Sequence, residues 1–168
     1  MRADGLPERP CGPLRVGLLG ESLIGCRTSA GKVGLIQEAC PHRGASMFFG
    51  RNEEDGLRCV YHGWKFDTTG ACVDMPSEPA ESNFKSKVRV ASYPGQEWGG
   101  AVWIYMGPPE LSPELPELEW CRVPEDHRFL RRRIHEANYA PAFTGALDPS
   151  HSALPTRPSH SHTPPPPP

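Results

Sequence analysis

The amino-acid sequence lacks the long apolar runs that place a protein across a membrane. No stretch of its 168 residues approaches the about 18 consecutive apolar residues that a membrane-spanning helix needs. Residues 1–17 also lack the apolar segment of a secretory signal peptide. We therefore expect no membrane partner and a cytoplasmic location.

Charge of one sign is not in excess either. The 18 Lys and Arg residues stand against 20 Asp and Glu residues, which gives a formal net charge of −2. Proteins that bind nucleic acid through a basic surface carry a clear positive excess. We expect no nucleic-acid partner.

The six cysteines are not expected to form a disulfide framework. Such frameworks belong to oxidising compartments, whereas clustered cysteines in a reduced protein more often bind metal. The apolar share of the composition is only 37%, while 21 prolines and 17 glycines predict many turns and at least one stretch without a packed core.

Short strands separated by turns dominate the sequence up to residue 106. This pattern predicts a mainly β fold, an antiparallel β-sandwich or small barrel. A further strand is expected at Phe129–His135 and a short helix at Glu136–Leu147. The strands of the β domain are predicted at Leu14–Leu19, Ser22–Arg27, Lys32–Glu38, Leu57–Val60, Trp64–Asp67, Ala71–Val73, Lys87–Ser92 and Ala101–Met106.

Two Cys/His pairs are the strongest chemical signal. Cys40 and His42 are separated by one residue, and Cys59 and His62 by two. One cysteine and one histidine from each of two loops is the ligand set of a Rieske [2Fe–2S] cluster, in which the thiolates hold one iron and the imidazoles the other. These four residues are the candidate cluster ligands.

A glycine closely follows each histidine, at Gly44 and Gly63. Glycine reaches positive φ at little cost, which lets backbone N–H groups close around a cluster. Alternatives remain at this point. A zinc site is one, although zinc sites favour C-x₂₋₄-C and H-x₃₋₅-H pairings. Buried cysteines and hydrogen-bonded histidines without any metal are another.

The segment CPHRGASMFFGRNEEDGLRCVYHGWKFDTTG, residues 40–70, resembles the Rieske domain of the nonhaem-iron aromatic-ring-hydroxylating oxygenase α subunits. It is most similar to the phthalate and phenoxybenzoate dioxygenase-like group, and the similarity extends over roughly residues 13–151. The resemblance implies a mainly β Rieske domain with two cluster-binding loops. It places Trp64 beside the cluster, while Met47, Phe48 and Phe49 are expected in the core.

The same resemblance implies how the full-length family works. Electrons pass from NAD(P)H through a flavin and iron–sulfur reductase to the Rieske cluster. They then reach a mononuclear Fe(II) in a larger catalytic domain, where O₂ hydroxylates an aromatic substrate. Full-length members of the family form homo-oligomers.

Part of that second iron site is expected near residue 150. By resemblance, Asp148 matches the bridging carboxylate and His151 the first Fe(II) ligand, whereas Thr156 stands where the second histidine belongs. We expect the chain to be truncated after its Rieske domain, to bind no mononuclear Fe(II), and to accept electrons without hydroxylating a substrate. Its status as an enzyme is therefore left open.

The expected domain organisation follows. It comprises a flexible N-terminus at 1–12, a Rieske domain at 13–107, a Pro/Glu-rich connector at 108–127, the start of a truncated catalytic domain at 128–151, and a disordered, Pro-rich, low-complexity tail at 152–168.

Two functional classes fit these features: the electron-transfer domain of an oxygenase, and a stand-alone Rieske ferredoxin-like carrier.

In either class we expect a low reduction potential. High-potential Rieske proteins have an extra cysteine in each ligand loop, and here Ala45 and Tyr61 occupy those positions. The residues after His62 are Gly63 and Trp64, so the serine hydroxyl of high-potential proteins is missing.

Overall fold

The structure is a computed structural model in which residues 3, 12–79, 81–131 and 135–150 are described. The chain divides into two compact units, residues 1–132 and 133–168. Almost all of the predicted flexible N-terminus and the whole predicted Pro-rich tail lie outside the described residues.

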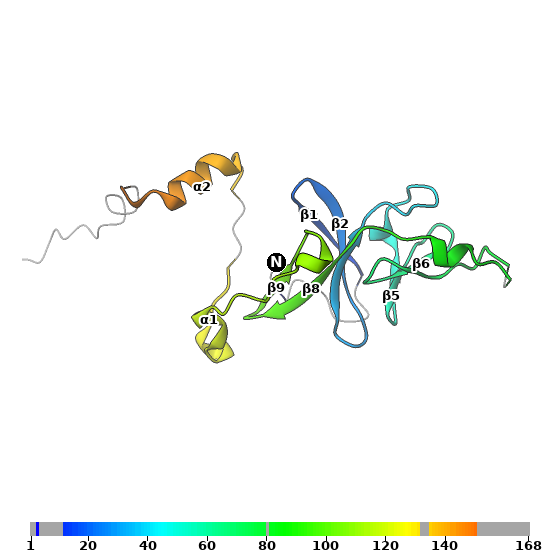
Figure 1. Ribbon diagram of the computed structural model, residues 1–168, viewed down its shortest axis with the longest axis horizontal. Coiled ribbons are helices and arrows are strands. Elements are labelled where there is room, and N and C mark those ends of the chain that lie inside the picture. Colours follow the sequence, from blue (N-terminus) through cyan, green and yellow to red (C-terminus); the bar gives the residue numbers. More distant parts are fainter. Residues whose placement is uncertain (1–2, 4–11, 80, 132–134, 151–168) are drawn as a thin grey trace, which may run out of the picture. The chain divides into compact units, whose positions relative to one another are not determined.

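The first unit confirms the predicted mainly β, antiparallel fold (Figure 1). Five strands form one sheet in the order β1-β2-β3-β8-β9, and every neighbouring pair is antiparallel. The edge strand β1 alternates partly buried and exposed residues, as expected where one face meets solvent. The bounds of these strands are Leu14–Leu18 (β1), Glu21–Arg27 (β2), Val33–Gln37 (β3), Ser92–Trp98 (β8) and Ala101–Ile104 (β9).

Strand β8 corrects the predicted strand at Lys87–Ser92. Residues 84–87 instead form a 3₁₀ helix, and β8 begins at Ser92. The sequence hid this strand because it contains Pro94 and Gly95. Pro94 pairs only with Gly34 on β3, because the pairing of β8 with β9 begins at Gly95. The missing N–H of Pro94 therefore interrupts no ladder between β8 and β9.

A second, four-stranded sheet surrounds the second Cys/His pair in the sequence, with two strands before this pair and two after it. Its order is β4-β5-β6-β7, again antiparallel throughout. Strand β4 was not predicted, because its Arg-Asn-Glu sequence has no apolar residue to signal a strand. The bounds are Arg51–Glu53 (β4), Gly56–Arg58 (β5), Lys65–Asp67 (β6) and Cys72–Asp74 (β7).

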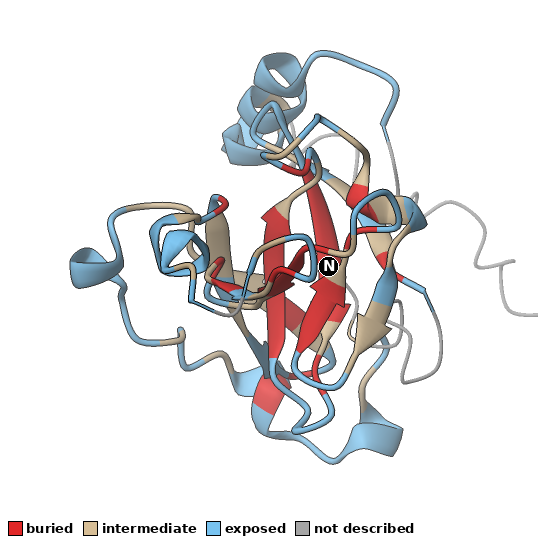
Figure 2. Cartoon of the chain, turned by 90° about the vertical axis from the view of Figure 1, so that its right-hand side faces the viewer, coloured by how far each residue is buried: buried red, intermediate tan, exposed pale blue. Residues whose placement is uncertain are grey.

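The main core joins the two sheets. Ile24 and Ile36 of the first sheet cluster with Leu57 and Phe66 of the second, and all four are completely buried. Figure 2 shows the buried residues concentrated on the strands. Met47 is also fully buried there and Phe48 packs against it, as predicted, but Phe49 is 67% exposed, so its expected place in the core is wrong.

The predicted strand at Phe129–His135 is wrong where the structure describes it, because residues 129–131 and 135 form no strand.

Short helices make up the remaining regular structure of the described residues. In the second unit the predicted helix is present but starts later, at Tyr139, after Asn138 caps it by accepting a hydrogen bond from Ala140 N–H. The helices are α1 (Glu119–Arg122), α2 (Tyr139–Leu147), and 3₁₀ turns at Met47–Phe49, Phe84–Lys87, Pro109–Leu111 and Glu125–His127.

Within the described residues, no helix has the length and apolar character needed to span a bilayer.

The close approach of β5 and β6 generates a stability prediction. A Cβ added at Gly56 would lie 2.6 Å from the backbone oxygen of Phe66, which cannot move without breaking the ladder. We expect Gly56→Ala to lower the free energy of unfolding by about 1–3 kcal/mol, measured by urea denaturation. The control is Gly17→Ala on β1, where nothing lies within 4 Å of the added Cβ. Equal midpoints for the two variants would contradict the close packing.

Candidate metal centre

The first Cys/His pair lies in a tight loop, residues 40–45, hereafter loop 1. Cys40 N–H donates to the Ala45 carbonyl at 2.9 Å, and Gly44 N–H donates back to the Cys40 carbonyl at 2.8 Å. Gly44 has φ +70°, which closes the turn and requires glycine.

The second pair lies in loop 2, residues 59–64, which repeats the same backbone pattern. Cys59 N–H donates to the Trp64 carbonyl at 2.8 Å, and Gly63 N–H donates to the Cys59 carbonyl at 3.1 Å. Gly63 has φ +76°. The positive φ expected at both glycines is confirmed, and the two loops present their cysteine and histidine in the same way despite unequal spacing.

The two cysteines lie together in the interior. Cys40 and Cys59 are each 2% exposed, belong to the same core cluster, and have interacting thiols. Burial, with a smaller contribution from the nearby Cys59 thiol, raises the pKa of Cys40 to about 11. A thiolate at this position therefore needs a positive partner, which a bound metal supplies.

The two histidines lie together on the solvent side. The ring centroids of His42 and His62 are 4.4 Å apart, and His62 is exposed. The Nδ1 atom of His42 is buried and has no hydrogen-bond partner among the described residues. Desolvation and, to a smaller extent, the neighbouring His62 lower the pKa of His42, which favours the neutral imidazole that a metal ligand requires.

Trp64 lies beside this pair, as expected. Its ring stacks on His42 with centroids 4.5 Å apart and planes 5° apart, while its Nε1 donates to Ser77 Oγ at 3.2 Å. The hydrogen bond to Ser77 holds the Trp64 ring, and the stack on this ring holds the His42 ring. The exposed Tyr61 ring lies next to the His62 ring, with ring centroids 3.8 Å apart.

The four candidate ligands separate into an inner thiol pair, Cys40 and Cys59, and an outer imidazole pair, His42 and His62. This division fits a [2Fe–2S] cluster, whose irons have different ligands, better than the single tetrahedral zinc ion considered above.

The second predicted iron site is only partly within the described residues. Asp148 is the C-cap of α2; its N–H donates to the Thr144 carbonyl, and its Oδ1 accepts from Ser150 N–H at 2.9 Å. His151 and Thr156 lie outside the described residues. Asp148 belongs to the second unit, whereas loops 1 and 2 belong to the first.

Comparison with known proteins identifies the family to which this fold and these two loops belong. Residues 1–94 match the Rieske [2Fe–2S] domain, and the chain belongs to this family. It is 50% identical over 139 residues to the oxygenase subunit of 3-chlorobenzoate-3,4-dioxygenase from Comamonas testosteroni and 46% identical over 141 residues to that of phthalate 4,5-dioxygenase from Pseudomonas putida. These matches cover 83% and 84% of this chain but only 32% of each relative, so the chain spans about a third of their length.

Solved structures show the same relationship. Dicamba monooxygenase bound to dicamba matches with a TM-score of 0.60 at 30% identity, covering 69% of this chain and 34% of that one. The oxygenase in the reduced oxygenase–ferredoxin complex of carbazole 1,9a-dioxygenase matches with a TM-score of 0.56 at 29% identity, covering 64% and 27%.

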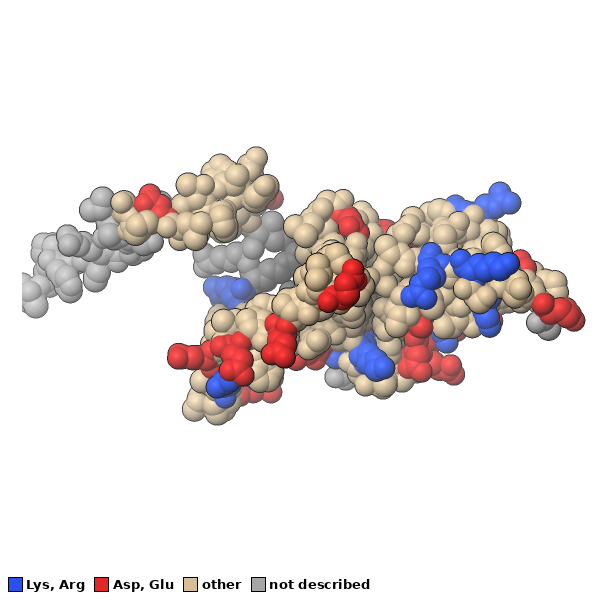
Figure 3. Space-filling model, viewed as in Figure 1, with Lys and Arg blue, Asp and Glu red and all other residues tan. Residues whose placement is uncertain are grey.

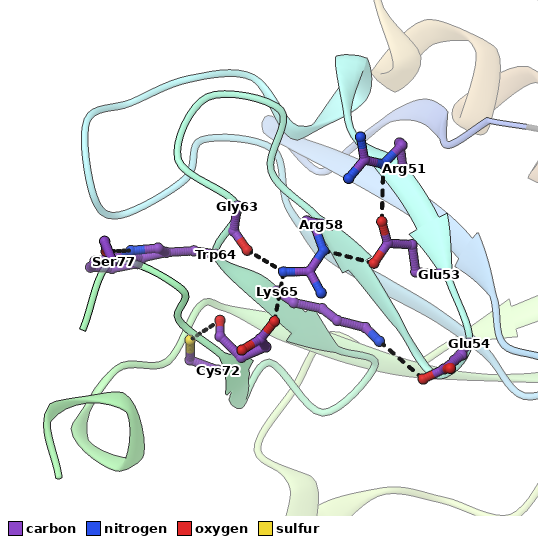
Figure 4. A network of polar contacts seen from close by, with 10 residues as sticks. Arg51, Glu53, Glu54, Arg58, Gly63, Trp64, Lys65, Cys72 and Ser77 are labelled. Carbon is purple, nitrogen blue, oxygen red and sulfur yellow. Dashed lines mark hydrogen bonds and ion pairs between the residues drawn. The ribbon is translucent and has the colours of Figure 1, made fainter. Parts of the chain in front are cut away.

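Sequence reasoning missed a polar network beneath loop 2 (Figure 4). Arg58 Nε donates to Glu53 Oε2, and Arg58 Nη1 donates to Asp74 Oδ2, both at 2.7 Å. Arg51 Nε also donates to Glu53, at 2.9 Å. Hydrogen bonds from Arg58 lower the pKa of both carboxyl groups. The only sequence signal was an arginine directly before Cys59, which does not reveal its partners.

The lowered pKa of Glu53 generates a pH prediction. Its ion pairs contribute fully above about pH 4.3, the pKa of an unfolded glutamate, and this contribution disappears as the pH falls through the lower pKa of the folded protein. We expect Glu53→Gln to cost about 1 kcal/mol at pH 7 and progressively less below pH 4.3 or so, measured as the difference in urea midpoint from the unchanged protein.

The neighbouring Glu54→Gln is the control for this series. The Glu54 side chain is 82% exposed and lies 3.6 Å from Lys65 Nζ, so its replacement should change the midpoint little at any pH. A difference for Glu53→Gln that stays constant from pH 7 to pH 3 would contradict the assigned ion pairs.

Proposed function

We propose that Cys40, His42, Cys59 and His62 hold a Rieske [2Fe–2S] cluster and that the chain transfers single electrons. The observation that carries this proposal is the meeting of two matching loops, with their thiols together inside and their imidazoles together outside. When bound, such a cluster accepts and releases one electron at a time.

The residues around the loops have distinct tasks in this proposal. Cys40 and Cys59 exclude water from the inner side, because both are almost fully buried. Trp64 keeps the His42 ring in one orientation, and the unpartnered Nδ1 of that ring is available to bind iron. His62 reaches solvent, so it is the shortest route for an electron between the site and a docked partner.

We further propose that the chain is the electron-transfer part of an aromatic-ring-hydroxylating oxygenase subunit. The match to oxygenase subunits covers 83% of the chain, whereas the Rieske family match ends at residue 94, so the similarity continues beyond the Rieske domain. A stand-alone ferredoxin-like carrier would not require this continuation. The proposed domain boundaries stay at 13–107 for the Rieske domain, 108–127 for the connector and 128–151 for the start of a catalytic domain.

The partners follow from that assignment. We propose an NAD(P)H-fed flavin and iron–sulfur reductase, or a ferredoxin, as electron donor, and a mononuclear Fe(II) site as acceptor. By resemblance, Asp148 matches the bridging carboxylate and His151 an iron ligand of this acceptor site in the full-length family. Because Thr156 stands where the second histidine belongs, we propose that this chain itself binds no mononuclear Fe(II). Homo-oligomer formation and an aromatic substrate are likewise proposed for the full-length protein. None of the five cysteines within the described residues forms a disulfide, which fits the proposed reducing cytoplasm.

The metal content tests the proposed cluster directly. The chain, purified after expression with iron and sulfide available, should be brown and contain two irons and two acid-labile sulfides per molecule. Cys40→Ala and His62→Ala should each abolish cluster assembly, because each removes a ligand. Iron, sulfide and zinc analysis with a visible absorption spectrum provides the measurement.

A matched cysteine variant controls for general damage. Cys121 is also buried, at 4% exposure, but belongs to α1 and to neither loop, so Cys121→Ala should retain the full iron content. A colourless protein containing one zinc ion would contradict the proposal, and so would normal iron content in His62→Ala.

The reduction potential should be low for a Rieske centre. The Trp64 Nε1 donates to Ser77 and the Tyr61 side chain is 62% exposed, so neither is held in place to donate to a cluster sulfur. Fewer hydrogen bonds leave the more negative reduced state less stabilised. Voltammetry near pH 7 should give a midpoint near the lower end of the Rieske range, which runs from about −150 to +300 mV. A midpoint above about +100 mV would indicate the high-potential class instead.

A further inference from the structure

The two matching loops differ in how their glycine carbonyls are held. In loop 2 the Gly63 carbonyl accepts a hydrogen bond from Arg58 Nη1 at 2.6 Å. Among the described residues, no side chain donates to the corresponding Gly44 carbonyl of loop 1. Loop 2 therefore has a side-chain support that loop 1 lacks, and this support acts directly after His62.

Arg58 is itself held in one orientation from two strands. Glu53 on β4 and Asp74 on β7 each accept a hydrogen bond from its guanidinium at 2.7 Å. Its side chain is only 17% exposed, so these charge-assisted bonds are partly shielded from water. In Figure 4 the Arg58 side chain lies between Gly63 and Glu53, with a dashed bond to each.

The position of the Gly63 carbonyl matters for the histidine before it. Gly63 has φ +76° and directly follows His62, so a hydrogen bond to its carbonyl acts on the backbone next to the ligand. His62 is exposed, and among the described residues its ring contacts the aromatic rings of His42 and Tyr61. Its orientation therefore depends mainly on the backbone that Arg58 holds, whereas His42 has the Trp64 stack and buried surroundings.

We propose that Arg58 is a positioning residue for the proposed cluster, which fixes the His62 imidazole by anchoring the Gly63 carbonyl to Glu53 and Asp74. This inference rests on the proposed function, because it assigns a task on the His62 side of the same site. A guanidinium is required, since a lysine ammonium carries the charge but not the rigid planar fork that reaches all three acceptors.

The test uses the purified full chain with its cluster and compares Arg58→Lys with Arg51→Lys. Arg51 also binds Glu53, but its side chain is 70% exposed, and within the described residues it forms no hydrogen bond or ion pair with loop 2. We expect Arg58→Lys to assemble the cluster but to release iron to a chelator about tenfold faster, the effect typical of losing a residue that orients a ligand. Arg51→Lys should release iron at the unchanged rate.

A spectroscopic measurement separates positioning from general stability. With ¹⁵N-labelled histidine, pulsed EPR of the reduced chain should show that Arg58→Lys changes the coupling of one imidazole nitrogen and leaves the other unchanged. A variant that merely unfolds more easily would keep both couplings. Unchanged couplings together with equal iron release in Arg58→Lys and Arg51→Lys would overturn the proposal.

Asp74→Ala provides a second variant if Arg58→Lys does not fold. It removes one acceptor that anchors Arg58 and leaves the bond to Gly63, so iron release should accelerate by a smaller factor, in the same direction. Unchanged iron release and couplings in Asp74→Ala would also overturn the proposal. If the unchanged chain itself holds no cluster, the proposed function fails; if it holds one and both variants behave normally, only the task of Arg58 is refuted.

Discussion

The paired backbone hydrogen bonds that close loops 1 and 2 determine where the four candidate cluster ligands lie. In each loop the cysteine N–H and carbonyl are both engaged within the loop, and a glycine with positive φ makes this possible. The cysteine side chains are thereby turned towards the core, whereas the two histidine rings lie next to each other, His62 exposed and His42 partly buried. The two loops therefore bring two thiols together in the core and two imidazoles together nearer the surface.

The rest of the β domain holds the two loops close to each other. Loop 1 follows the first sheet through β3, whereas loop 2 connects β5 and β6 of the second sheet. The core between the sheets, with Ile36 and Leu57 fully buried, thus fixes the distance between the loops. On the face shown in Figure 3, acidic side chains gather over the segment around α1, whereas basic and acidic side chains occur together over the part that carries β5 and β6.

The sequence was sufficient for features that depend on local pattern. The mainly β fold followed from short strands between turns, and the cluster loops followed from two Cys/His pairs with their glycines. Trp64 beside the site came from the family resemblance. Features that depend on distant partners were not predictable in this way. Strand β8 was hidden by Pro94, whose missing N–H matters little only because β9 pairs from the next residue onward. The task proposed for Arg58 depends on Glu53 and Asp74, whose proximity only the folded sheet reveals.

The central claim is that two imidazoles bind one iron of a binuclear cluster in this chain. Mössbauer spectroscopy of the ⁵⁷Fe-enriched, one-electron-reduced protein tests it most directly, because the two irons are observed separately. We predict two distinct signals of equal area, a ferric iron with sulfur ligands only and a ferrous iron with the parameters of mixed nitrogen and sulfur ligation. Two irons with the same all-sulfur ligation, or no iron signal in a folded chain, would contradict the account.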